Sequence, residues 1–110
     1  MDRKIVIIPT YNEKENIEKI IRAVFSLEGE YHILVIEDGS PDGTAAIVKK
    51  LQAEFPVRLH MIERQGKLGL GTAYITGFKW SIEHGYDYIY SFVCKKRGYV
   101  GVCSHKFSRR

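Results

Sequence analysis

The chain has 110 residues, which is enough for one small domain. Hydrophobic residues make up 45% of it, so it can form a core, and it has no run of 18 or more apolar residues that would encode a transmembrane helix. Met1 to Lys4 lead directly into a short apolar segment without a secretory signal, so we expect a cytoplasmic protein.

The net charge of +4 is unevenly distributed. Residues 1–90 contain eleven Lys and Arg and all thirteen Asp and Glu, whereas residues 91–110 contain six Lys and Arg and no acid. This basic tail has no regular pattern, so we expect it to be disordered or artefactual and expect no nucleic-acid partner. Cys94 and Cys103 lie in the tail, and their spacing is not that of a zinc site.

The first elements are a buried strand over Lys4–Pro9 and a helix that begins at Asn12. Asn12 can cap this helix, and Glu15 three residues later completes a capping box. Gly29 ends the segment. The helix presents one apolar face, formed by Ile17, Ile20, Ile21, Val24 and Phe25.

A second buried strand over Ile33–Ile36 is followed by a helix that Ser40 can cap, with Pro41 at its first position. Pro56 ends this helix, and Val57–Ile62 is a third, less regular strand.

A glycine-rich loop over 64–72 leads to a helix from about Thr72 to His84, which Gly85 ends. A fourth strand begins in Tyr86–Tyr90, and after about Phe92 neither a helix nor a core strand is indicated. Strands and helices therefore alternate. This order predicts an α/β fold with a Rossmann-like, mostly parallel sheet and flanking helices.

Acidic residues follow the second strand directly, at Glu37 and Asp38. Ligands of open α/β sheets bind at the carboxyl ends of the strands, and an acid there suits a ribose, a base edge or a metal. Alternation sends the two side chains to different faces. We expect Asp38 to contact a ligand; alternatively it binds backbone N–H groups of its own turn. Asp42 lies in the first turn of the predicted helix, where an acid is favoured by the helix dipole, so we expect a structural role for it.

Two other segments are candidates for the same site. Tyr11 could stack on a base and Glu13 could accept from a ribose or base; the alternative is a tight turn in which Asn12 caps the helix and the helix dipole favours Glu13. Arg64, Lys67 and the neighbouring glycines could face a diphosphate. The loop lacks the third glycine of a dinucleotide fingerprint, which argues against a nicotinamide cofactor. The histidines have no metal-ligand spacing.

Three motifs together resemble glycosyltransferase family 2, most closely its dolichyl-phosphate (polyprenyl-phosphate) mannosyltransferase branch. They are Ile-Ile-Pro-Thr-Tyr-Asn-Glu at 7–13, Ile-Glu-Asp-Gly-Ser-Pro-Asp-Gly-Thr at 36–44 and Lys-Leu-Gly-Leu-Gly-Thr-Ala-Tyr at 67–74. The resemblance implies that residues 1–90 are the N-terminal, nucleotide-sugar-binding half of a GT-A domain.

The resemblance also implies an activity: inverting transfer of mannose from GDP-mannose to dolichyl or polyprenyl phosphate, with Mg²⁺ or Mn²⁺. It places Lys67, Gly69 and Gly71 near the donor phosphates. It implies peripheral association with the cytoplasmic face of a membrane, through the acceptor or a partner. The positions it assigns to the donor nucleotide are Pro9, Tyr11, Glu13, Ile36 and Asp38.

The sequence departs from the family after Tyr90. The family continues there with Asp-x-Asp, which binds the metal, whereas this chain has no acid after Asp87. No metal ligand or catalytic residue is identifiable, and the acceptor half is absent. The abrupt change is typical of a frameshift, a truncated gene product or a cloning artefact. We expect little activity from this chain alone; the alternatives are a non-catalytic nucleotide-binding fragment or a UDP-sugar transferase of the same family.

Overall fold

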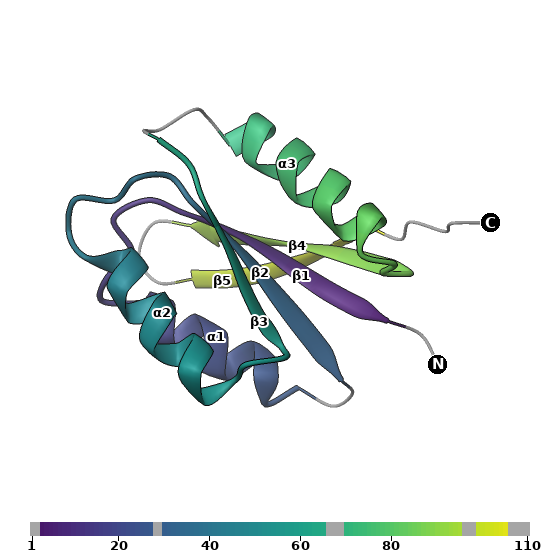
Figure 1. The fold of residues 1–110 in the computed structure, drawn as a ribbon, viewed down its shortest axis with the longest axis horizontal. Helices are drawn as coiled ribbons and strands as arrows, with labels where there is room; N and C mark the ends of the chain where they lie inside the picture. The colour runs from purple at the N-terminus through teal and green to yellow at the C-terminus, as the bar shows by residue number, and fades with distance from the viewer. Residues whose placement is uncertain (1–2, 28–29, 66–69, 96–98, 106–110) are drawn as a thin grey trace.

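A computed structural model of the chain describes residues 3–27, 30–65, 70–95 and 99–105. Its centre is a five-stranded sheet with the order β3-β2-β1-β4-β5 (Figure 1). The strands are β1 (Lys4–Thr10), β2 (Tyr31–Glu37), β3 (Leu59–Glu63), β4 (Tyr88–Lys95) and β5 (Tyr99–His105). The helices are α1 (Ile17–Phe25), α2 (Thr44–Glu54) and α3 (Leu70–Glu83). The first four strands are parallel to one another, which confirms the predicted α/β fold.

Helices cover both faces of the sheet, with α1 and α2 on one face and α3 on the other (Figure 1). Alternate residues of β1 enter the two cores: Val6 and Ile8 pack beneath α1 and α2, and Ile5 and Ile7 pack beneath α3. This is the alternation of a strand buried on both faces. None of the helices in the described ranges is long and apolar enough to cross a membrane.

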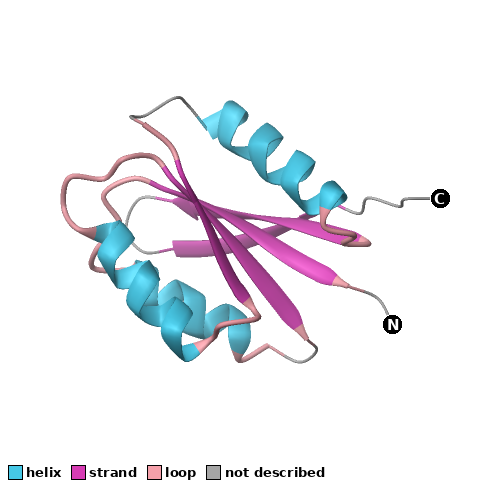
Figure 2. Cartoon of the chain, in the orientation of Figure 1, coloured by secondary structure: helices cyan, strands magenta, loops and turns pink. Residues whose placement is uncertain are grey.

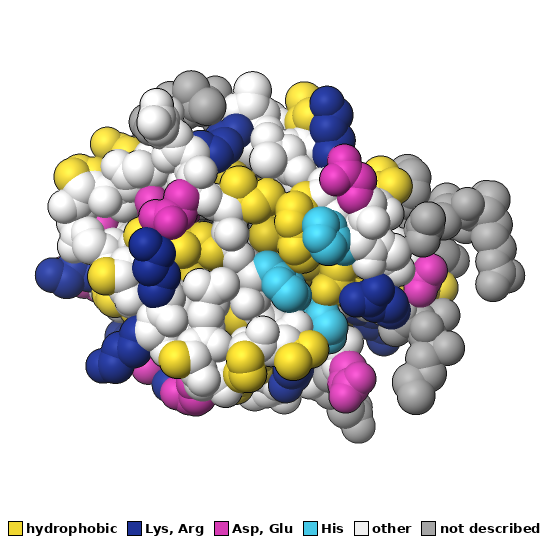
Figure 3. All heavy atoms as spheres, viewed as in Figure 1, with side chains coloured by type: hydrophobic (Ala, Val, Ile, Leu, Met, Phe, Trp, Pro, Cys, Tyr) yellow, Lys and Arg dark blue, Asp and Glu magenta, His cyan; other side chains and the backbone are white. Residues whose placement is uncertain are grey.

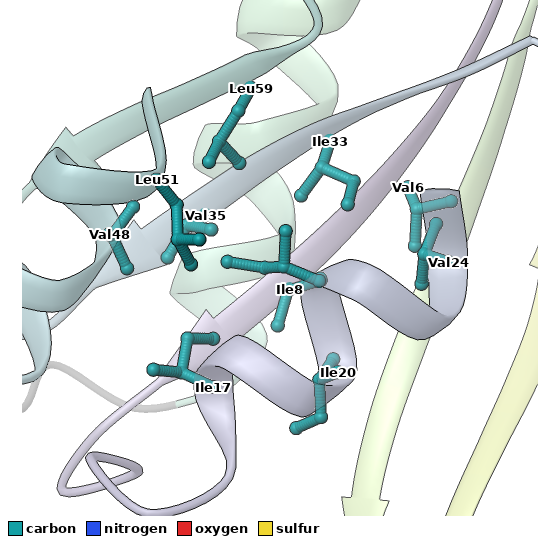
Figure 4. Close-up of a cluster of buried hydrophobic side chains, with 11 residues drawn as sticks. Val6, Ile8, Ile17, Ile20, Val24, Ile33, Val35, Val48, Leu51 and Leu59 are labelled. Carbon is teal, nitrogen blue, oxygen red and sulfur yellow. The ribbon is translucent and has the colours of Figure 1, made fainter. Parts of the chain in front are cut away.

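The core beneath α1 and α2 explains why the apolar stripe of the first helix was predictable. Ile17, Ile20, Ile21 and Val24 are all buried and lie on one side of α1. Figure 4 shows three of these side chains directed at Val6 and Ile8 of β1 and at the apolar residues of β2 and α2.

The predicted helix starts are wrong for the first two helices. α1 begins at Ile17 and not at Asn12, which has a φ of 54° in the loop before it. α2 begins at Thr44 after Gly43, whose φ is 95°, so neither Ser40 nor Pro41 starts it. The Ser40 hydroxyl accepts from the backbone N–H of Asn12 in the neighbouring loop, and the side chain that bonds to the start of α2 is that of Asp42, which accepts from the N–H of Thr44.

The expectation that regular structure ends near Phe92 is also wrong. β4 continues to Lys95, and β5 returns antiparallel to it, with Cys94 opposite Val100 and Phe92 opposite Val102. The missed signal was a pair of short segments rich in β-branched and aromatic residues on either side of the sequence Lys-Arg-Gly, which is a pattern typical of a hairpin.

Aromatic and histidine side chains form a cluster near the amino ends of the strands. His32 Nδ1 lies 2.7 Å from the hydroxyl of Tyr86, and the rings of His60 and Trp80 are 5.0 Å apart. Trp80 also stacks on His84, with ring centroids 3.8 Å apart. Histidines gather beside apolar side chains on the face shown in Figure 3. Burial lowers the pKa of both His32 and His60 below their ordinary value.

We predict that stability falls in mild acid because of these two histidines. Below a pH of about 6.5 the unfolded chain binds protons that folded His32 and His60 bind less readily, so protonation favours unfolding. The thermal midpoint should be steady above that pH and fall between about pH 6.5 and 5.5. Thermal unfolding followed by circular dichroism across this range tests the prediction. A His32→Gln, His60→Gln variant should show a flatter dependence, and an unchanged slope would contradict the assignment.

Candidate nucleotide site

The strand order reverses next to β1. β2 and β3 extend the sheet on one side of β1, whereas α3 returns the chain so that β4 pairs with β1 on its other side. Ligands of open α/β sheets bind at such a reversal, outside the carboxyl ends of the strands. The loops that follow β1 and β2 lie side by side at this end of the molecule (Figure 2).

Asp38 follows β2 and is buried, with its side chain 7% exposed. Arg64, which follows β3, donates to both of its oxygens, from Nε to Oδ1 at 2.6 Å and from Nη2 to Oδ2 at 2.8 Å. This carboxylate raises the pKa of Arg64 above its ordinary value. Among the contacts of the described residues, the Asp38 carboxylate binds Arg64 and no backbone N–H group of its own turn. Arg64 in turn faces a carboxylate and not a phosphate.

Arg64 also connects this pair to α3. Its Nη1 donates to the hydroxyl of Thr72 at 3.1 Å, in the first turn of that helix. Its backbone N–H donates to the carbonyl oxygen of Glu37 at 2.7 Å. Arg64 thus joins the ends of β2 and β3 to the start of α3.

Glu37 lies on the opposite face from Asp38, as the alternation predicted, and is 2% exposed. Its carboxylate accepts hydrogen bonds from the backbone N–H of Ser40, at 3.0 Å to Oε2, and from the hydroxyl of Ser40. The two adjacent acids therefore have separate partners, which removes the repulsion expected of neighbouring carboxylates in one environment.

Side chains of the β2–α2 loop and of the first residue of α2 accept hydrogen bonds from three consecutive backbone N–H groups of the β1–α1 loop. The N–H of Asn12 donates to Ser40 Oγ at 2.8 Å, that of Glu13 to Thr44 Oγ1 at 3.1 Å, and that of Lys14 to Asp42 Oδ2 at 3.1 Å. The hydroxyl of Thr44 donates to Asp42 Oδ1 at 2.5 Å. This bond, together with backbone N–H donors, lowers the pKa of Asp42.

The other predicted positions lie around this site. Tyr11 is 37% exposed and Glu13 is half-buried in the loop after β1. Pro9 is half-buried and pairs in register with Ile36, whose side chain is fully buried in the core beneath α3. Gly71 lies in the first turn of α3. Lys67 and Gly69 lie outside the described residues.

Sequence reasoning missed the roles of Arg64, Ser40 and Thr44. Arg64 was expected to face a phosphate, but its guanidinium donates to the buried carboxylate of Asp38. Ser40 and Thr44 were available as signals, because Ser, Thr and Asp in turns often bond to nearby backbone N–H groups.

The residues that the structure describes do not fit a divalent metal. Among them, no group of three or more His, Cys, Asp or Glu side chains lies close enough together to hold an ion. Asp38 is paired with an arginine, and Glu37 and Asp42 bond to hydroxyl and N–H groups.

Comparisons with known proteins agree with the motifs. Residues 5–89 match the model of Glycosyl transferase family 2. Over 85 residues the chain is 48% identical to polyprenol monophosphomannose synthase of Mycolicibacterium smegmatis and 44% identical to undecaprenyl-phosphate mannosyltransferase of Micrococcus luteus. Each match covers 77% of this chain, but only 32% and 35% of those two proteins. The chain thus spans about a third of the length of the curated relatives that it matches.

Solved structures show the same fold. A mannosyltransferase from Pyrobaculum calidifontis in complex with GDP-Man and Mn²⁺ has a TM-score of 0.69 and 25% identity, over 80% of this chain and 26% of that one. TarS of S. aureus has a TM-score of 0.68 at 22% identity, over 81% of this chain and 26% of that one, which bears on the fold alone. The family match covers most of the chain, which therefore belongs to glycosyl transferase family 2.

Proposed function

We propose that this chain is the donor-binding half of an inverting transferase that moves mannose from GDP-mannose to a polyprenyl phosphate. One observation carries the proposal: all three motif segments meet at the strand-order reversal. Asn12 of the first segment bonds to Ser40 of the second, and Asp38 of the second is joined through Arg64 to Thr72 of the third. The two mannosyltransferase relatives support the choice of sugar and acceptor.

In this proposal Asp38 and Tyr11 contact the guanosine. Arg64 occupies one acceptor position on each oxygen of Asp38, and a carboxylate oxygen has two, so the carboxylate can still accept from a base N–H. Tyr11 lies in the adjoining loop after β1, and its partly exposed ring offers a stacking surface. Glu13, which is half-buried in the loop after β1, would accept from the ribose.

Calorimetric titration with GDP, GDP-mannose and UDP tests the donor assignment. We expect GDP and GDP-mannose to bind with a Kd of about micromolar and UDP to bind more weakly. Tyr11→Ala should weaken GDP binding about tenfold or more, because base stacking on an aromatic ring contributes about 1–3 kcal/mol. Leu27→Ala is the control, since Leu27 is similarly exposed (47%) but follows α1. Equal or tighter binding of UDP would contradict the guanosine assignment.

A second candidate function, a non-catalytic nucleotide-binding module, is favoured by the absence of any acid after Asp87 in this chain. The two candidates differ in turnover. A mannosyl-transfer assay with GDP-mannose, Mn²⁺ or Mg²⁺ and a polyprenyl phosphate should show little or no transfer by the 110-residue chain alone. Metal-dependent turnover of about 1 s⁻¹ or more would favour a complete transferase site.

A further inference from the structure

Glu37 has no role in the proposed donor contacts, yet it is an almost fully buried carboxylate at the edge of the site. A buried acid is costly unless hydrogen bonds compensate it. Both compensating donors that the structure gives it belong to Ser40, namely the backbone N–H and the hydroxyl. The position of Ser40 is therefore set by Glu37.

The hydroxyl of Ser40 has a defined direction because of this bond. Its proton is donated to Glu37, so its oxygen is left to accept, and it accepts from the N–H of Asn12 at 2.8 Å. Asn12 has a φ of 54°, and it is the one non-glycine residue with a positive φ among the residues that the structure describes. A left-handed conformation is unfavourable for a side-chain-bearing residue unless its surroundings hold it.

Asn12 lies between Tyr11 and Glu13, so its backbone conformation decides the directions of both side chains. The N–H of Glu13 is held in the same way by Thr44, whose hydroxyl proton goes to Asp42. Two carboxylate–hydroxyl pairs therefore hold two successive N–H groups of the β1–α1 loop. One pair joins the end of β2 to the β2–α2 loop, and the other joins that loop to the first residue of α2.

We propose that Glu37 is a positioning residue of the nucleotide site: through Ser40 it holds Asn12 in its left-handed conformation and thereby orients Tyr11 and Glu13 toward the nucleotide. This inference rests on the proposed function for the ligand, but the effect of Glu37 on the loop does not. Glu37 touches no ligand in this scheme.

Two measurements on the full chain test the proposal. In amide hydrogen exchange followed by NMR, Glu37→Gln and Ser40→Ala should each raise the exchange rate of the Asn12 N–H by about tenfold. In calorimetry, both variants should raise the Kd for GDP by about tenfold, which is the loss expected for one charge-assisted hydrogen bond. Ser40→Thr keeps the hydroxyl and should restore most of the affinity.

Two controls separate positioning from general stability. Glu15→Gln makes the same chemical change at an exposed acid of the β1–α1 loop and should change neither measurement. Val24→Ala removes a buried side chain of α1 and should lower the thermal midpoint without changing the Kd for GDP. If Glu37→Gln lowers the midpoint but leaves both the exchange rate and the Kd unchanged, the proposal is wrong.

The two proposals fail differently. If the wild-type chain does not bind GDP, the proposed function is wrong, but faster exchange at Asn12 in Glu37→Gln would still support the positioning role. If GDP binds and the Asn12 exchange rate is the same in wild type and variants, the positioning role fails and the donor assignment stands.

Discussion

Replacing Asp38 with alanine is expected to lower the free energy of unfolding by about 3 kcal/mol, because removal of one partner of a buried ion pair leaves the other uncompensated. The group left without its partner in the variant is the guanidinium of Arg64, whose side chain is only 10% exposed. Urea unfolding followed by circular dichroism measures the change. The exposed pair Arg22–Glu54 is the matched control, and Glu54→Ala should have a much smaller effect.

A double-mutant cycle makes this prediction specific. Arg64→Leu combined with Asp38→Ala removes both charges, so the double variant should be more stable than the sum of the single losses predicts. Strictly additive losses would show that the pair is not coupled. The double variant also separates stability from binding: it should fold well and yet fail to bind GDP, since it lacks the Asp38 carboxylate.

Gly77→Ala is expected to lower the free energy of unfolding by about 1–3 kcal/mol, which is the usual cost of overpacking a core. A Cβ at this position would lie 2.7 Å from Cδ1 and 2.8 Å from Cγ2 of Ile7. Ile7 is fully buried in β1, so α3 must move away from the sheet or Ile7 must leave its conformation. This cost exceeds the gain of about 1 kcal/mol that alanine brings to a helix interior.

Gly71 provides the matched control within the same helix. No atom lies within 4 Å of a Cβ built there, so Gly71→Ala should raise the free energy of unfolding by up to about 1 kcal/mol. Ile7→Val removes the Cδ1 atom and should recover part of the loss when it is combined with Gly77→Ala. Urea unfolding of the variants tests this, and similar stabilities for Gly77→Ala and Gly71→Ala would contradict the close packing of α3 on β1.

Much of the fold could be predicted because burial determines it. The continuous apolar runs of β1 and β2, and the stripe of α1, follow from periodicity alone. The helix starts could not be predicted, because the Ser40 hydroxyl binds the N–H of Asn12, in a loop that is distant in sequence, rather than an N–H of its own helix. Local capping signals do not reveal which of two N–H groups a side chain will bind.

The meeting of the motif segments at one end of the sheet was predictable, and their side-chain contacts were less so. Alternation separated Glu37 from Asp38, and the parallel order placed the first two motifs side by side. The pairing of Asp38 with Arg64 spans two strand ends and depends on the distance between β2 and β3, which no local pattern contains. The roles of Pro9, Tyr11, Glu13, Ile36 and Asp38 toward a donor remain predictions.

The central place of β1 has a consequence for synthesis on the ribosome. Lys4 of β1 pairs with Tyr31 on one side and with Tyr88, 84 residues later, on the other. β1 is translated before the other strands of this sheet, but one of its edges has no partner until β4 has also emerged. Pairing across so long a loop is slow, so this apolar strand is the segment most exposed to misassembly while translation continues.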